Sequence, residues 1–222
     1  CYRDPCCGAC HFAMRRHRLA MIPQACELFD DEEEKHQVNI VHPSWAQPRK
    51  HLDGARPEAA KQWVRRRLEK LGRPIRAVGS FEVTLNVELD GTRHWAGEVV
   101  MIIAGARKEH IASVLKLRTR DKKRLQPHAK PIKFSSVKNL ARQIGYANKR
   151  YLEQRIAYID GQGRQNRKHW PLDVSDGDAA DAWLAGMGIF DRDFHVGCGW
   201  RAGKLALLPR RLQSMKRRND FS

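Results

Sequence analysis

One segment of this chain, residues 77–104, alternates apolar and polar side chains and so constrains the fold more than any other. A period of two predicts β-strands, and the sequence Leu89-Asp90-Gly91 at its centre predicts a tight turn. A two-residue Asp-Gly loop would put Val87 opposite His94 and mix the faces, whereas a three-residue loop pairs Asn86 with His94 and keeps them apart. We therefore predict a β-hairpin with a three-residue loop. Its apolar face consists of Phe81, Val83, Leu85, Val87, Trp95, Val99 and Met101.

The opposite face of this hairpin is polar and brings two carboxylates together. The same register places Glu82 opposite Glu98. Like charges directly opposite each other destabilise a sheet unless something positive lies between them. A divalent cation, Mg²⁺ or Mn²⁺, would supply that charge, and His94 on the same face could add a nitrogen ligand. The alternative is that both carboxylates face solvent or the many arginines.

The remaining segments predict helices and strands that together give an α+β fold. Helices are expected over 11–28, over 57–71 with Gly72 as the cap, over 108–117 and over 178–184, and strands over 36–42, 194–198 and 204–208. Ser135 or Ser136 is expected to cap a longer helix that runs to about Ile156. The core side of that helix would carry Val137, Leu140, Ala141, Ile144 and Tyr151. We divide the chain into residues 1–35, 36–165 and 166–222.

Tyr146 lies on the other side of that expected helix, together with Asn139, Arg142, Lys149 and Arg150. A tyrosine with a lysine one turn later can act as a nucleophile on a phosphodiester, with Lys149 stabilising the phosphate or the leaving oxygen. The alternative is a surface tyrosine that stacks on bases or on its neighbours.

Five of the six cysteines lie within the first 26 residues. This spacing is more typical of a metal site in a reducing cytoplasm than of a secreted disulfide framework. Cys7 and Cys10 form a two-residue knuckle, and Cys1 lies five intervening residues before it, so these thiolates are suited to a structural Zn²⁺. The fourth ligand could be Cys26, Cys6, His11 or His17. The alternative is a set of free thiols.

The charge of the chain predicts a polyanionic partner. The 42 Lys and Arg outnumber the 25 Asp and Glu, and the formal net charge is +17. Binding should weaken steeply with salt, because each neutralised phosphate releases counterions. Solvated helix faces and a basic tail are the alternative, and no apolar stretch approaches the roughly 20 residues that span a membrane. The residues expected to contact nucleic acid are Arg118, Arg120, Lys122, Lys123, Arg124, Arg142 and Arg150.

Together, these motifs resemble those of the HUH replication initiators and the related rolling-circle transposases. The resemblance covers the C-x5-C-x2-C knuckle, the 38–41 strand, the strand with Phe81-Glu82, the strand that begins Trp95-Ala96-Gly97-Glu98, and Tyr146-Ala147-Asn148-Lys149, which matches the Y-x-x-K motif. It implies a ferredoxin-like antiparallel sheet with flanking helices and a metal site opposite the tyrosine helix. It also implies that Tyr146 forms a 5′-phosphotyrosine link to single-stranded DNA, helped by Lys149.

The chain departs from this family at the motif that gives the family its name. The family's His-hydrophobic-His should follow Trp-x-Gly, where this chain has Glu98-Val99-Val100. One ligand position is therefore a carboxylate, and the other has no side-chain donor. Glu82 falls where the family often supplies an acidic ligand. Because metal activation of the phosphate contributes several kcal/mol, impaired nicking is expected.

The sequence thus predicts a cytoplasmic DNA-binding protein of rolling-circle initiator or transposase ancestry, encoded by a bacterium, virus or plasmid, which holds single-stranded or hairpin DNA. Tyrosine-mediated nicking at an impaired site is the enzymatic form of this hypothesis. The alternatives are a catalytically inactive accessory subunit of a larger complex and an RNA-binding protein that uses the zinc knuckle and its basic arms.

Overall fold

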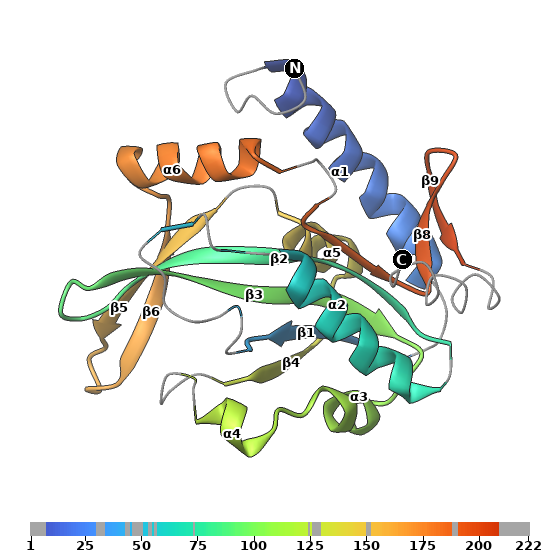
Figure 1. The fold of residues 1–222 in the computed structure, drawn as a ribbon, viewed down its shortest axis with the longest axis horizontal. Helices are drawn as coiled ribbons and strands as arrows, with labels where there is room; N and C mark the ends of the chain where they lie inside the picture. Colours follow the sequence, from blue (N-terminus) through green and yellow to red (C-terminus); the bar gives the residue numbers. More distant parts are fainter. Residues whose placement is uncertain are drawn as a thin grey trace.

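A computed structural model gives the fold (Figure 1) and describes residues 8–29, 34–42, 45, 51–52, 55, 57–72, 74–123, 125, 130–149, 152–187 and 191–208. The helices are α1 (Gly8–Phe29), α2 (Pro57–Leu68), the 3-10 turn η1 (Glu69–Leu71), α3 (Lys108–Leu115), α4 (Thr119–Lys122), α5 (Leu140–Ala147) and α6 (Val174–Ala185). The strands are β1 (Lys35–Ile40), β2 (Arg76–Val87), β3 (Arg93–Ala104), β4 (Ile132–Ser136), β5 (Glu153–Ile159), β6 (Gln165–Trp170), β7 (Asp193–Val196), β8 (Cys198–Arg201) and β9 (Lys204–Leu207).

The predicted hairpin and its register are confirmed. β2 and β3 pair with Glu82 opposite Glu98 and Asn86 opposite His94. The Glu88 N–H donates to the Thr92 carbonyl at 2.9 Å, which leaves a three-residue loop. Gly91 takes a positive φ of 80° in that loop, a backbone conformation that residues other than glycine rarely adopt. The alternating pattern and the loop glycine were therefore sufficient to define the centre of the fold.

The hairpin lies within a mixed sheet with the strand order β4-β1-β3-β2-β5-β6, and β7 also pairs with β2. The pairs among β4, β1, β3 and β2 are antiparallel, but β5 pairs with β2 in parallel. The expectation of a wholly antiparallel sheet is therefore wrong, because β5 reaches β2 through a crossover rather than a hairpin. β8 and β9 form a small separate sheet. The fold is mixed α/β, and β7 brings residues beyond 166 into the central sheet.

Apolar clusters cover both faces of the sheet, and we call the faces the α2 face and the α5 face. On the α2 face, Phe81 and Val99 pack with Val64 of α2 and Leu115 of α3. On the α5 face, a second cluster surrounds one end of the hairpin. Its buried members are Met21, Ala25, Phe29, Val78, Ile102, Ala104, Ile144, Cys198 and Leu205. The other end of the α5 face carries the polar side chains, so the sheet positions them beside a rigid core.

The long helix expected from Ser135 or Ser136 to Ile156 is wrong. Both serines lie in β4, and α5 extends only from Leu140 to Ala147. Asn139 caps the start of α5, because its side-chain oxygen accepts the Arg142 N–H at 2.9 Å. Asn148 ends the helix, because its side chain donates to the Ile144 carbonyl at 2.8 Å. Strand β5 then begins at Glu153.

Several other expected elements are confirmed with shifted ends. Helices α1, α2 and α3 match the segments expected at 11–28, 57–71 and 108–117, and Gly72 ends η1 with a φ of 66°. α6 begins earlier than expected, at Val174, where Asp173 accepts the Asp176 N–H. The strand expected at 194–198 is divided between β7, which pairs with β2, and the start of β8 at Cys198, which pairs with β9. Among the described residues, no helix is both long and apolar enough to cross a membrane.

Candidate functional site

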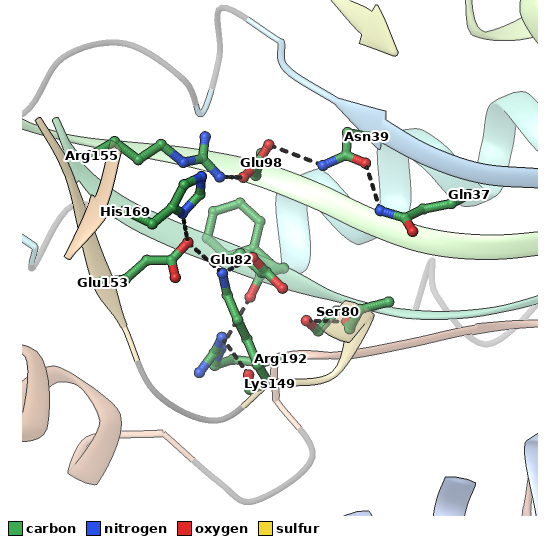
Figure 2. Close-up of polar contacts among 12 residues, drawn as sticks. Gln37, Asn39, Ser80, Glu82, Glu98, Lys149, Glu153, Arg155, His169 and Arg192 are labelled. Carbon is green, nitrogen blue, oxygen red and sulfur yellow. Dashed lines mark hydrogen bonds and ion pairs between the residues drawn. The ribbon is translucent and has the colours of Figure 1, made fainter. Parts of the chain in front are cut away.

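Charged side chains from four parts of the chain meet on the α5 face (Figure 2). Their charges also act on the hydroxyl of Tyr146. β2 contributes Glu82 and β3 contributes Glu98, which are directly opposed. The turn after α5 contributes a lysine, and β5 contributes an acid and an arginine. We call this set the tyrosine site, and its members are Glu82, Glu98, Tyr146, Lys149, Glu153 and Arg155.

Backbone contacts hold the end of α5 against β2 and so fix the position of Lys149. The Ser80 hydroxyl donates to the Ala147 carbonyl at 2.7 Å. The buried Arg192 guanidinium donates to the Lys149 carbonyl at 3.2 Å and to the Phe81 carbonyl at 3.0 Å. Since Lys149 lies beyond the last helical residue, its side chain turns inward instead of sharing the exposed side of α5. It is only 2% exposed, so its expected place on a wet helix surface is wrong.

The Lys149 ammonium lies between two carboxylates. Its Nζ is 2.7 Å from Glu153 Oε1, to which it donates a hydrogen bond, and 3.2 Å from Glu82 Oε2. The second contact is an ion pair without a directed hydrogen bond, since neither Glu82 oxygen has a hydrogen-bond partner within the described residues. His169 lies on the other side of Glu153, with Nδ1 2.6 Å from the same Oε1. One positive charge is therefore shared between two buried acids.

The pKa values follow from this unequal sharing. Burial raises the pKa of Glu82 to about 7, helped by the charge of Glu98, although Lys149 and Arg192 oppose the rise. Burial alone would raise the pKa of Glu153. The hydrogen bond and charge of Lys149 and the contact with His169 outweigh burial, so the pKa of Glu153 is lowered. Burial would lower the pKa of Lys149, but the acids outweigh burial and raise it. The ammonium thus stays charged and neutralises Glu153 better than Glu82.

Arg155 neutralises the second acid of the opposed pair. Its guanidinium donates a hydrogen bond to Glu98 Oε1 and forms an ion pair with that carboxylate. The amide of Asn39, on β1, donates to the other Glu98 oxygen at 3.5 Å. Lys149 and Arg155 therefore balance the like-charge repulsion between Glu82 and Glu98. This arrangement resembles the alternative in which the two carboxylates face basic side chains instead of a metal ion.

The described residues do not fit a divalent cation at this pair. A metal ion would have to displace the Lys149 ammonium or the Arg155 guanidinium, and no group of three His, Cys, Asp or Glu side chains in the described ranges could hold one. His94 lies opposite Asn86, four residues along β3 from Glu98, which is about 13 Å along the strand. Its ring is 3.7 Å from Glu88 instead. The structure therefore does not bring His94 to the two acids.

Tyr146 is half-buried beside these charges. The Lys149 Nζ lies 4.7 Å from the centroid of the Tyr146 ring, so the lysine faces the ring. Burial raises the pKa of the Tyr146 hydroxyl, Lys149 lowers it, and the charges of Glu82 and Glu98 raise it further. The net effect of burial and of these charges is a pKa above the ordinary value of a tyrosine.

The zinc-knuckle residues are only partly described. Cys1, Cys6 and Cys7 lie outside the described residues, as do the side chains of Cys10 and His11. Cys10 and Cys26 lie on the same helix, α1, sixteen residues and hence about 24 Å apart. One zinc ion holds its sulfur ligands at about 2.3 Å and cannot bind both. Cys26 is therefore not the fourth ligand to a site at Cys10, and it packs against the apolar cluster of the α5 face.

The candidate histidine His17 contacts an acid and an aromatic ring. Its Nε2 lies 3.0 Å from Asp193 Oδ2 on β7, and its ring lies 4.6 Å from that of Trp200. Histidines that bind a metal through one ring nitrogen commonly contact a carboxylate through the other, so Cys26 is the one candidate that the described residues exclude.

The expected nucleic-acid contacts fall on two sides of the sheet. Arg118, Lys122 and Lys123 are exposed on and around α4, which follows α3 of the α2 face. Arg142 is exposed on α5, on the opposite face. The side chain of Arg120 and residues Arg124 and Arg150 lie outside the described part of the chain. The two basic sets therefore do not line one groove around the tyrosine site.

The sequence missed two members of the tyrosine site, Glu153 and Arg155, because a helix was expected through Ile156. A signal was present: Gly161-Gln162-Gly163 predicts a turn shortly after these residues. Arg192 carried no such signal, since its contacts are with the carbonyl groups of distant residues.

Comparison with known proteins identifies no relative. No protein-family model matches the chain, no curated protein matches it, and no solved structure matches it. The geometry of the described residues therefore carries the functional conclusion.

Proposed function

We propose that this chain binds nucleic acid, foremost single-stranded or hairpin DNA, and that its tyrosine site descends from that of the rolling-circle initiators without using their metal-dependent cleavage. The grouping of Tyr146 with Glu82 and Glu98 on one face of the sheet is the observation that carries the proposal. The resemblance to the HUH proteins implies a tyrosine helix opposite the acidic positions of this hairpin.

The topology of the first four strands supports the same ancestry. The segment runs β1-α2-η1-β2-β3-α3-α4-β4, and its strands lie in the antiparallel order β4-β1-β3-β2. This connectivity is that of the ferredoxin-like split βαβ arrangement. α2 and α3 pack in one cluster on the α2 face, which leaves the α5 face for the tyrosine site.

One observation argues against metal-dependent cleavage: Lys149 and Arg155 supply the positive charge that the two acids would otherwise take from a metal ion. The chain also carries a formal net charge of +17, for which a phosphate backbone is the simplest partner.

Salt dependence tests the binding. We expect a labelled single-stranded oligonucleotide to bind with an affinity that falls roughly 20-fold between about 50 and 200 mM salt, as three phosphate contacts predict for a single strand. Fluorescence anisotropy at increasing salt measures the slope, and a labelled acidic polypeptide is the matched polyanion. Absence of binding at the lowest salt contradicts the proposal, and preferential binding of structured RNA supports the RNA-binding alternative instead.

A covalent-adduct assay tests the absence of cleavage. We expect no Tyr146-dependent adduct on a denaturing gel after incubation with single-stranded DNA and Mn²⁺, because Lys149 and Arg155 lie beside the two acids where a metal ion would bind. The variant Tyr146→Phe is the control, and it should bind DNA like the wild type. An adduct that forms in the wild type and disappears in Tyr146→Phe would establish the nicking activity that we exclude.

A further inference from the structure

The β5 and β6 hairpin presents two aromatic rings and a lysine on one exposed face. β6 pairs with β5 so that Tyr158 lies opposite Asn166, Ile156 opposite Lys168, and Gln154 opposite Trp170. Directly opposed residues share a face, so Tyr158, Lys168 and Trp170 project from the same side. Tyr158 is 44% exposed and Trp170 is 47% exposed. The hairpin lies at the end of the sheet farthest from α2, at the left of Figure 1.

The charge around these rings favours a polyanion over a neutral or basic protein segment. Lys168 is the basic side chain on the face of the two rings, whereas Arg167 lies on the other face as an ion pair with Glu88, and Arg164 pairs with Asp160. The Lys168 ammonium lies 4.5 Å from the centroid of the Trp170 ring, so a positive charge sits beside the most exposed aromatic surface. A phosphate could pair with this ammonium while a base contacts the ring. An acidic peptide would satisfy the lysine alone.

The other face of the same hairpin belongs to the surroundings of the tyrosine site. Arg155 and His169 are directly opposed on that face. Arg155 contacts Glu98, and His169 contacts Glu153. Trp170 stands at the end of the hairpin where β5 begins at Glu153, and Tyr158 stands near the turn. A strand lying along the aromatic face would therefore run on the side of the hairpin opposite the tyrosine site, from the turn at Tyr158 to the end at Trp170.

From these placements we infer that the exposed face of the β5 and β6 hairpin is a stacking surface for unpaired bases, with Trp170 and Tyr158 as platforms and Lys168 as the adjoining phosphate contact. The inference rests on the proposed function and adds how the protein would select single strands. Stacking on exposed aromatic rings suits single-stranded nucleic acid, because the bases of a duplex already stack on one another.

The test compares Trp170→Ala with Trp170→Phe in the full chain. We expect the alanine variant to bind a single-stranded oligonucleotide about tenfold more weakly, since one base–aromatic stack contributes on the order of 1–3 kcal/mol. The phenylalanine variant should stay close to the wild type, and affinity for a duplex of the same sequence should not change. Leu207→Ala, which truncates another exposed apolar side chain, is the matched control. Circular dichroism establishes that each variant is folded.

The outcomes separate the inference from the proposed function. If the wild type binds single strands and Trp170→Ala binds them equally well, the stacking surface is wrong and the proposed function stands. An equal loss of duplex affinity in Trp170→Ala also overturns stacking, because it would show a general effect on charge or fold. If the wild type binds no nucleic acid at low salt, the proposed function fails and the stacking surface fails with it.

Discussion

Replacing Lys149 with methionine should lower the free energy of unfolding by about 3–5 kcal/mol near pH 8, the usual cost of removing one partner of a buried ion pair. The ammonium is the group that faces both Glu82 and Glu153, and Glu82 is fully buried. Methionine fills a similar volume but leaves the Glu82 carboxylate in the sheet without the lysine charge. Urea denaturation followed by circular dichroism measures the change.

Two further variants make this result interpretable. Lys138→Met removes an exposed lysine just before α5 and should change the unfolding free energy by less than about 0.5 kcal/mol. Combining Lys149→Met with Glu82→Gln removes the unbalanced charge and should recover most of the loss, because the two residues interact directly. A loss below about 1 kcal/mol in Lys149→Met near pH 8 would mean that the ammonium does not neutralise these acids.

Glu82→Gln should remove a pH-dependent change in stability of about 3 kcal/mol. The pKa of Glu82 is raised from 4.5 to about 7 in the folded chain, chiefly by burial. The folded chain therefore binds this proton more tightly than the unfolded chain. Its stabilising contribution is complete below pH 4.5 and is lost as the pH rises through about 7. Glutamine stays neutral throughout, so the variant should gain stability over the wild type as the pH rises.

The buried His195 changes the stability with pH in the opposite direction and must be separated from Glu82 in this experiment. Burial lowers the pKa of His195 from 6.5 to about 4, so the unfolded chain binds more protons between these values and stability rises with pH there. The contributions of Glu82 and His195 to the unfolding free energy oppose each other below pH 6.5. The pH dependence of wild-type stability alone therefore does not isolate the contribution of Glu82. The difference between wild type and Glu82→Gln, measured by urea denaturation from about pH 5 to 8, does isolate it. Glu109→Gln, at an exposed position of α3, is the matched control.

The hairpin could be predicted because its information is local. Alternation fixed the faces, and a one-residue slip would have mixed polar with apolar side chains, so Glu82 opposite Glu98 followed directly. The helical spacing of the apolar residues also predicted that Tyr146 lies on a helix, on the side away from the apolar core residues. These inferences needed only residues close together in the chain.

The partners of those acids could not be predicted, because they depend on where a helix ends and which strand is neighbour to β2. Asn148 ends α5 one residue before Lys149, which lets that side chain turn towards the sheet. Glu153 reaches the site because β5 pairs in parallel with β2, opposite Thr84. Long-range parallel pairing leaves no signature in a short window of sequence. The identity of the positive charge was therefore left open between a metal ion and the basic side chains.

The parallel pairing of β5 with β2 has a consequence for the order of assembly. β2 and β3 are joined by a tight turn, whereas Thr84 and Glu153 come from segments about seventy residues apart. Closing a long loop costs more entropy than closing a short one, so the hairpin should form first and β5 should dock late. Until then Glu98 lacks Arg155, and the early hairpin carries unneutralised negative charge. Docking of β5 and β6 is thus favoured electrostatically, and their transient release would expose the acids while the apolar core stays folded.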